Sequence, residues 1–482
     1  MSRLIVVSNR VTPQQAEGGA SQGGLSMALS AALREYSGIW FGWSGASTTA
    51  WTGELNEQKV GGVTVVTVDL EEQDIEEYYN GYANRTLWPL FHYRIDLTQY
   101  ERSYGSGYAR VNARFAEVLA PLIRPDDIIW VQDYHLIPLG RELRERGVRN
   151  AIGFFLHIPW PARELVVTLP RHRQLVESLF YYDVIGFQTQ EWRNAFVAYV
   201  LYEASGMAMT DGQVRAFGRT VLPKAFPIGI DAQGFSKLLK TETAQESYAR
   251  MIESKAGRRM LLGVDRLDYS KGIEERILAY DRLLADHPEL RGQTFLLQIS
   301  TETRSEVDAY QEMMARLDAL SGRINGAYAE VDWVPVRNVH RMHTREELAG
   351  VYRAADVMLV TPLRDGMNLV AKEFVAAQNE ADPGVLVLSR FAGAAQQMRE
   401  ALIVNPFSQE DVADAIKRAL EMPADERRRR WRALMDGVEK DDIVAWRDSF
   451  VQCLQGVREG DLAKGPRARK IRPFPDVPTG SA

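Results

Sequence analysis

Short apolar runs alternate with longer amphipathic segments along most of this chain. The apolar runs are Leu4–Val7, Ile128–Val131, Ile152–Leu156 and Val184–Phe187 in the first half, and Met260–Val264, Phe295–Ile299, Val357–Val360 and Val385–Leu388 in the second. Helical patterns lie between them, as in Glu274–Leu284 and Ala309–Leu320. This alternation predicts an α/β protein with parallel sheets covered by helices on both faces. Two sets of strands fit two doubly wound domains better than one very large sheet.

The boundary between the two domains is expected near Pro227–Asp231, where a strand-like segment ends before the polar stretch Lys237–Arg259. This boundary gives an N-terminal domain of residues 1–230 and a C-terminal domain of residues 231–455. The remaining residues, 456–482, are rich in proline and basic side chains. We expect them to form a flexible tail.

Composition narrows the class of protein. The net charge of −6 over 482 residues argues against a nucleic-acid binder, because no overall basic field attracts phosphate backbones. The single cysteine, Cys453, excludes an intrachain disulfide and a cysteine cluster for zinc. No apolar run approaches the ~18 residues of a membrane span, and the N-terminal run is too short for a signal peptide. We therefore expect a cytoplasmic protein without a membrane partner.

The segment Thr361–Glu373 links an apolar strand to a predicted helix through a turn that contains Gly366 and Asn368. A turn from strand to helix directs backbone N–H groups and the positive end of the helix dipole toward one point, which suits a phosphate. Glu373 lies about two helical turns beyond Asp365, close enough to reach a sugar bound beside that phosphate. An ordinary helix start with Asn368 near the cap explains the segment equally well.

Two cations follow the strand Met260–Val264. Arg266 and Lys271 leave the same strand end and are suited to one diphosphate, because charge-assisted hydrogen bonds to phosphate are strong. The alternative is that they pair with the nearby carboxylates of Asp265 and Asp268. This alternative carries most weight for Lys271, since lysines are common at strand ends.

The first half places further polar residues at predicted strand ends. Arg10 follows the first strand and precedes the glycine-rich loop Gly18–Gly24, where a backbone can approach a phosphate closely. Asp133 and His157 each end an apolar run and are candidates for the same cleft. A buried structural histidine is the alternative for His157, and we interpret His135 as structural.

Several signatures are absent from the sequence. No Asp-x-Asp motif follows an apolar strand, and no His and carboxylate cluster has the spacing of a metal site. We therefore expect no metal and no cofactor. Arg266, Lys271 and helix N-termini would then neutralise the charge of a leaving diphosphate. A Walker-type phosphate loop and a Gly-x-Ser-x-Gly nucleophile motif are also missing.

Taken together, these segments resemble glycosyltransferase family 20, the family of the trehalose-6-phosphate synthases. The matching motifs are Val7–Arg10, Trp40–Gly45, Leu87–Pro89, Asp133–His135, Phe154–Pro159, Arg266–Gly272 and Thr361–Glu373. They follow the family's order and spacing from Ser2 to about residue 455, and the tail is not covered.

The resemblance implies a GT-B fold, in which two Rossmann-like domains face a central cleft and the last helix crosses back to the first domain. It implies a metal-independent, retaining transfer of glucose from UDP-glucose to glucose 6-phosphate, giving trehalose 6-phosphate and UDP. UDP-glucose would be a co-substrate. The family often forms homo-oligomers, and a separate phosphatase would be needed to make free trehalose.

The resemblance also assigns roles to residues. Those implied for acceptor binding are Arg10, Tyr79, Trp88, Asp133 and Arg304. Those implied for donor binding are Gly23, Gly24, Arg266, Lys271, His343, Glu373 and the backbone N–H groups of Gly366, Met367, Asn368, Leu369 and Val370. The implied catalytic set is His157, Asp133, Arg266, Lys271 and Asp365, with His157 and Asp365 positioning the transferred glucose.

Other functions stay open at this stage. His343 stands where the family often has an aromatic residue, so the preference for UDP over ADP or GDP is not fixed. A related synthase with another acceptor is disfavoured by Tyr79, Trp88, Arg10 and Arg304 together. A non-catalytic sensor of sugar phosphates is disfavoured because the cleft residues are all present. Retention normally indicates a carboxylate nucleophile. The sequence offers no good candidate, and the family is thought to use front-face attack.

Overall fold

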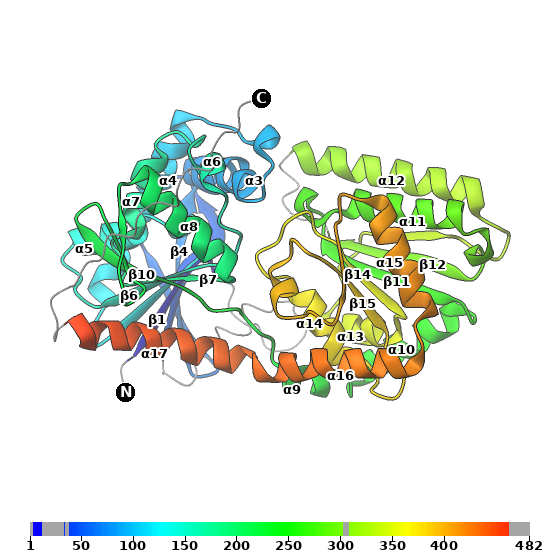
Figure 1. The fold of residues 1–482 in the computed structure, drawn as a ribbon. Coiled ribbons are helices and arrows are strands. Elements are labelled where there is room, and N and C mark those ends of the chain that lie inside the picture. Colours follow the sequence, from blue (N-terminus) through cyan, green and yellow to red (C-terminus); the bar gives the residue numbers. More distant parts are fainter. Residues whose placement is uncertain (1–2, 12–32, 34–37, 302–307, 462–482) are drawn as a thin grey trace, which may run out of the picture.

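The structure is a computed structural model that describes residues 3–11, 33, 38–301 and 308–461. The described chain forms two β-sheets, one in each half of the sequence, and each sheet is flanked by helices (Figure 1).

The first sheet has ten strands, and its parallel centre places the ends of β1, β5 and β6 side by side. Its order is β3 (Leu55–Val60), β4 (Val63–Glu71), β2 (Ile39–Thr48), β1 (Leu4–Arg10), β5 (Ile128–Gln132), β6 (Ala151–Leu156), β7 (Val184–Phe187), β10 (Arg219–Ala225), β9 (Val214–Ala216) and β8 (Met207–Ala208). The strands from β4 to β10 are parallel, whereas β3, β9 and β8 form antiparallel edges.

The second sheet has six strands and is parallel throughout. Its order is β13 (Val336–Val339), β12 (Thr294–Thr301), β11 (Arg259–Arg266), β14 (Val357–Val360), β15 (Val385–Ser389) and β16 (Leu402–Val404). All eight apolar runs predicted to be strands are strands. They are mostly buried on both faces, as expected for parallel sheets covered by helices. The predicted α/β class is confirmed.

Helices connect the strands in both halves. In the first half they are α2 (Glu72–Asp74), η1 (Ile75–Leu87), α3 (Trp88–Phe91), η2 (Ile95–Leu97), α4 (Arg102–Leu119), η3 (Ala120–Leu122), η4 (Tyr134–Leu136), α5 (Leu139–Glu145), α6 (Arg163–Val166), α7 (His172–Leu179) and α8 (Gln190–Glu203). In the second half they are α9 (Ala232–Leu238), α10 (Glu242–Lys255), η5 (Tyr269–Lys271), α11 (Ile273–Asp286), η6 (Pro288–Leu290), α12 (Asp308–Tyr328), α13 (Arg345–Ala354), α14 (Leu369–Ala377), η7 (Gly393–Gln396), α15 (Gln409–Glu421), α16 (Ala424–Lys440) and α17 (Ile443–Asp461).

The segment η1 is a π-helix of 13 residues. π-Helical turns are rare and usually short, and they are frequent at functional sites. Nothing in the local sequence predicts a π-helix here. It begins directly after α2 and leads directly into α3, so the three form one continuous helical rod with Tyr79 inside it and Trp88 at its end.

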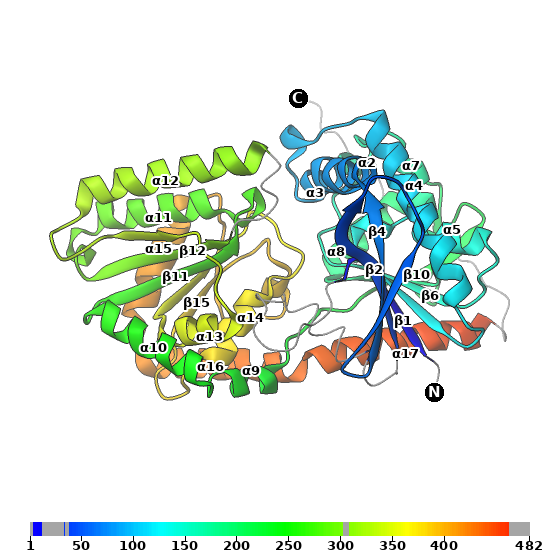
Figure 2. The ribbon, with the colours of Figure 1, turned by 180° about the vertical axis from the view of Figure 1, so that it is seen from behind.

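The last helix, α17, lies against the first sheet although α16 belongs to the second half (Figures 1 and 2). The ring of Phe450 stacks on Trp130 of β5 with ring centroids 4.6 Å apart. Gly153 of β6 and Gly186 of β7 face the same ring, and a Cβ on either would lie within 2.9 Å of it. α17 runs to Asp461, so the predicted tail beginning at residue 456 starts within a helix.

We predict that Gly153→Ala lowers the melting temperature of the protein. The added Cβ would lie 2.7 Å from the ring of Phe450, and overpacking of this kind costs about 1–3 kcal/mol. The matched control is Gly322→Ala in α12, where no atom lies within 4 Å of the added Cβ. That change should be neutral or stabilise by about 0.5–1 kcal/mol. Differential scanning fluorimetry compares the two, and equal melting temperatures would contradict the packing described.

Candidate active site

The carboxyl ends of strands from both sheets meet at one place. The closest approach is at Gly366, which follows β14: a Cβ there would lie 1.9 Å from the carbonyl oxygen of His157, which follows β6. Gly393 packs equally closely against Gly366 itself. A Cβ at Gly393 would lie 2.0 Å from the carbonyl oxygen of Gly366. Only glycine fits these positions, and the contact of Gly366 with His157 brings the backbones of the two halves together.

Lys271 and Asp365 form an ion pair beside this contact. The Nζ of Lys271 lies 2.5 Å from Oδ2 of Asp365, and the side-chain amide of Asn368 donates to the same oxygen at 3.1 Å. Burial by itself raises the pKa of Asp365, but the charge and hydrogen bond of Lys271 outweigh it and hold the pKa below its ordinary value. Asp365 is therefore a carboxylate at neutral pH.

The alternative pairing considered from the sequence is wrong. Asp265 pairs with the buried guanidinium of Arg276 at 2.5 Å. Asp268 accepts hydrogen bonds from the backbone and the hydroxyl of Ser270, at 2.9 and 2.8 Å. Neither carboxylate pairs with Lys271. Its partner is Asp365, which is far from it in the sequence.

Asn368 precedes α14 with a φ of 73°, a left-handed conformation that asparagine tolerates better than most residues. It occupies the N-cap position, but its side chain makes no capping hydrogen bond and donates to Asp365 instead. Its Oδ1 is buried without a hydrogen-bond partner among the described residues. The N–H groups of the first helical turn, beginning at Leu369 and Val370, have no intrahelical acceptor. The side chain of Asn368 therefore leaves these N–H groups uncapped at the start of α14.

His157 is held between two glutamines. The amide of Gln188 donates to Nδ1 at 3.3 Å, and Nε2 lies 2.8 Å from Oε1 of Gln132, which indicates the neutral tautomer with its hydrogen on Nε2. Burial lowers the pKa of His157 to about 3. The imidazole is therefore uncharged at neutral pH, and both of its nitrogens are engaged by the two glutamines.

Asp133 lies beside His157. It follows β5 with a φ of 74°, and its Oδ1 accepts hydrogen bonds from the backbone N–H groups of Tyr134, at 3.0 Å, and His157, at 3.1 Å. One carboxylate oxygen thus ties together the ends of β5 and β6. The structure brings these two predicted residues together.

The residues implied for acceptor binding include aromatic rings, and arginine side chains lie over rings at this site. The guanidinium of Arg10 lies 5.6 Å from the ring of Trp43, and Trp43 meets Tyr79 edge-on at 5.6 Å. Further along, Arg266 from the second half lies 5.5 Å from the ring of Trp88. This last contact brings a donor candidate and an acceptor candidate together across the two sheets.

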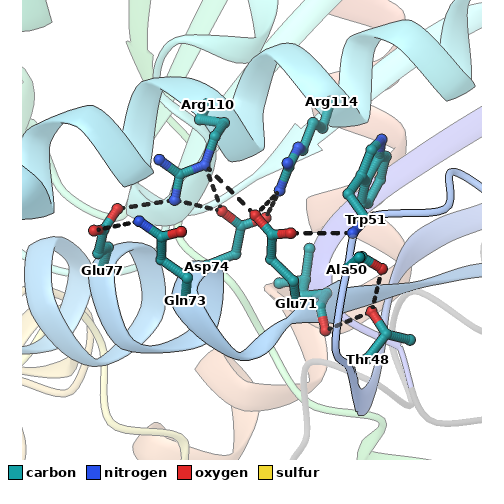
Figure 3. A network of polar contacts seen from close by, with 10 residues as sticks. Thr48, Ala50, Trp51, Glu71, Gln73, Asp74, Glu77, Arg110 and Arg114 are labelled. Atoms are coloured by element: carbon teal, nitrogen blue, oxygen red, sulfur yellow. Dashed lines mark hydrogen bonds and ion pairs between the residues drawn. The ribbon is translucent and has the colours of Figure 1, made fainter.

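A network of ion pairs anchors the π-helix that carries Tyr79 (Figure 3). Asp74, fully buried, pairs with both Arg110 and Arg114 of α4. Arg110 also donates to Glu77 at 2.8 Å, and Arg114 donates to Glu71 at 2.7 Å. Two arginines on α4 thus neutralise the buried carboxylate of Asp74, and the network fixes where η1 begins relative to α4.

Glu373 lies on α14 with Arg345 as its neighbour, at 3.5 Å. Burial raises the pKa of Glu373, and the positive charge of Arg345 only partly offsets this effect. His343 precedes α13 and its Nδ1 lies 3.0 Å from the carbonyl oxygen of Arg341. Met367 is buried behind the turn, where its carbonyl accepts from Ala394 at 2.9 Å. Gly23, Gly24 and Arg304 lie outside the described residues.

Sequence reasoning missed several residues at this site. Arg364 lies between the halves, 3.6 Å from the ring of Tyr93 and 5.2 Å from that of Trp192. Lys372 is buried on α14 and donates to the carbonyl of Ile228 at 2.7 Å, which ties α14 to the chain segment linking the two sheets. Burial lowers the pKa of Lys372 to about 8. A cation inside the apolar pattern of Leu369–Ala377 was the signal that could have found it.

Within the described ranges, no group of three or more His, Cys, Asp and Glu side chains is arranged to hold a metal ion. None of the helices in the described residues has the length and apolar character to cross a membrane.

Comparison with known proteins identifies the family. The model of glycosyltransferase family 20 matches residues 2–456. The chain belongs to glycosyltransferase family 20. It is 47% identical over 460 residues to a trehalose-6-phosphate synthase of Sinorhizobium fredii, covering 94% of this chain and 98% of that protein. It is 46% identical over 457 residues to the trehalose-6-phosphate synthase of Salmonella typhi, covering 95% and 96%.

Solved structures of this family have the same fold. A Burkholderia xenovorans trehalose-phosphate synthase in complex with glucose-6-phosphate has a TM-score of 0.91 and 46% identity, and covers 94% of this chain and 100% of that one. The E. coli protein bound with UDP-2-fluoro glucose has a TM-score of 0.90 and 43% identity, and covers 97% and 100%. The prediction of a GT-B fold from the family 20 motifs is confirmed.

We predict that His157 makes the protein less stable in acid. The unfolded chain binds a proton at its ordinary pKa near 6.5, whereas the folded protein does so only near pH 3. The free energy of unfolding should therefore fall as pH drops from about 6.5 toward 3. Melting temperatures of wild type and His157→Asn between pH 4 and 7 test this expectation, and the variant should show the weaker dependence.

The control for this comparison is His287→Asn at the end of α11, a partly exposed position. It leaves His157 in place, so the fall in stability assigned to His157 should persist in this variant. Burial also lowers the pKa of His92, to about 4, and this contribution is common to all three proteins. A His157→Asn profile parallel to that of the wild type would contradict the assignment.

Proposed function

We propose that this chain transfers glucose from UDP-glucose to glucose 6-phosphate with retention at the anomeric carbon, giving trehalose 6-phosphate and UDP. The observation that carries the proposal is the meeting of the two sheets' strand ends. Arg266 of β11 lies over Trp88, and Gly366 contacts the backbone of His157. Donor and acceptor candidates therefore share one site. Family membership and the similarity to synthases solved with glucose-6-phosphate and with UDP-2-fluoro glucose support the same substrates.

The donor diphosphate is proposed to lie at the start of α14. The N–H groups of its first turn, which the side chain of Asn368 does not cap, are donors suited to diphosphate oxygens. Lys271 is already fixed by Asp365, and an ammonium has further N–H groups for a phosphate oxygen. Arg266 adds a second cation. This arrangement stabilises the negative charge that develops as UDP leaves.

In the proposed reaction, the bond between glucose C1 and the diphosphate oxygen breaks. A new bond forms between C1 and the anomeric hydroxyl oxygen of glucose 6-phosphate, on the same face. The proton of that hydroxyl moves to the departing phosphate oxygen. His157, neutral and with both ring nitrogens engaged by Gln132 and Gln188, positions the transferred sugar and supplies no proton.

The remaining assignments are part of the same proposal. Arg10, Tyr79 and Trp88 hold the acceptor phosphate, together with Arg304. Glu373 binds the ribose, Gly23 and Gly24 contact the diphosphate, and the segment around His343 contacts the base. The enzyme works in the cytoplasm without a metal, and a separate phosphatase consumes its product. We also propose a homo-oligomer, which light scattering after size-exclusion chromatography would reveal or exclude.

Product analysis tests the proposed reaction. Glucose 6-phosphate is incubated separately with UDP-, ADP- and GDP-glucose in the presence of a chelator, and products are identified by NMR. We expect an α,α-1,1-linked disaccharide phosphate, formed fastest from UDP-glucose. Folded protein that forms no product with any donor would reject the proposal in favour of a sugar-phosphate sensor or another acceptor.

Arg266 provides a sharper test of the site. We predict that Arg266→Ala lowers kcat roughly 10²-fold or more, because the variant loses a cation aimed at the developing charge. The matched control is Arg259→Ala at the opposite end of the same strand, where the arginine pairs with Asp356 at 3.0 Å. That variant should retain near-normal turnover. Steady-state kinetics with both substrates compare them, and near-normal kcat in Arg266→Ala would remove Arg266 from the mechanism.

A further inference from the structure

A second cavity opens in the first half, away from the candidate active site. It has a volume of about 540 Å³ and lies between η1, α4, α5 and α7. None of the residues proposed above for substrate binding lines it. Figure 1 shows α4, α5 and α7 grouped at one side of the first sheet. The volume falls within the range of about 300–1,000 Å³ that is usual for small-molecule sites.

Three arginines from three different elements line this cavity. Arg102 begins α4, Arg141 lies on α5, and Arg171 precedes α7. Among the cavity's lining residues the one acidic side chain is Glu101. The lining therefore carries an excess of positive charge in a protein whose net charge is −6.

These arginines are only partly neutralised within the chain. Arg141 has weak ion pairs with Glu142, at 3.4 Å, and Glu145, at 3.7 Å, and its Nε is buried without a hydrogen-bond partner in the described part of the structure. Arg102 and Arg171 form no ion pair with any described carboxylate. A guanidinium left in this state is suited to a phosphate, which it can bind through two parallel hydrogen bonds.

Aromatic rings also line the cavity. Tyr82 of η1 packs on Tyr108 of α4 with centroids 4.4 Å apart, and Tyr100 lines the same cavity. Burial raises the pKa of Tyr82, and the nearby positive charge of Arg171 partly opposes this. The phenol is therefore neutral, and the charge of Arg171 lies near it. Aromatic faces beside arginines suit a molecule that combines a phosphate with a sugar or a base.

We propose that this cavity is a binding site for a phosphorylated small molecule. Its phosphate is held by Arg102, Arg141 and Arg171, and its sugar or base packs against Tyr82 and Tyr100. The inference concerns a site separate from the catalytic cleft, so it does not depend on the proposed reaction. Two sources share this chemistry, a sugar phosphate and a nucleoside monophosphate.

Isothermal titration calorimetry tests the proposal with glucose 6-phosphate, AMP and inorganic phosphate as probes. The main variant is Arg171→Gly, because glycine suits the φ of 59° at this exposed position and removes the charge without straining the fold. The second is Arg141→Ala. The matched control is Arg146→Ala directly after α5, an arginine that also pairs with Glu142, at 3.0 Å, but does not line the cavity.

We expect wild type and Arg146→Ala to bind one more phosphorylated molecule per chain than the cleft accounts for. Arg171→Gly and Arg141→Ala should weaken this extra binding roughly tenfold or more, while UDP binding in the cleft stays unchanged. The stronger of the glucose 6-phosphate and AMP isotherms identifies the source. The proposal is overturned if none of the probes binds outside the cleft. It is also overturned if the cavity variants bind like wild type, or if glucose and adenosine bind as well as their phosphates.

Discussion

The close backbone contact between the two halves is the constraint on which the site depends. Gly366 lies so near the carbonyl of His157 that any side chain would collide with it. Gly393 packs just as closely against the carbonyl of Gly366. Because the contact is made by backbone, its position is set by the strands that precede it, β14 and β6. Asp365 and His157 are therefore held beside each other by two separate sheets. The crossing of α17 onto the first sheet secures the same arrangement, with Phe450 against Trp130 and the ring of Trp446 6.0 Å from that of His157.

The polar groups of the site are fixed before any substrate arrives. Lys271 holds Asp365 as a carboxylate, two glutamines hold His157 in one neutral tautomer, and one oxygen of Asp133 ties two strand ends together. The π-helix that presents Tyr79 is anchored by the buried pairs of Asp74. Groups that need not reorganise during the reaction are the ones that stabilise developing charge most effectively. This physical property connects the fold to the proposed transfer of a sugar.

Much of this could be predicted from the sequence. The buried strands were found because apolar runs in parallel sheets are continuous. Asp133, His157 and Arg266 became candidates because polar residues at strand ends face the cleft, whereas the role of Asp365 was implied by the family resemblance. The partner of Lys271 was missed because the nearer carboxylates are equally plausible in sequence, and only the fold shows that they are occupied. Arg364 and Lys372 were missed because a cation next to apolar residues has the same pattern on a surface. The charges of Glu71, Asp74 and Glu77 look like those of a solvated helix, and their burial depends on where α4 packs.

The sequence by itself determined the fold class, the strand ends that carry polar residues and the family, because these follow from local periodicity and from ordered motifs. Only the tertiary structure decided which charges pair, that His157 is neutral, that a π-helix carries Tyr79, and that arginines from three elements line a second cavity. Each of these depends on the distance between segments far apart in the chain and on the burial that their packing creates. Neither this distance nor this burial can be deduced from a local stretch of residues.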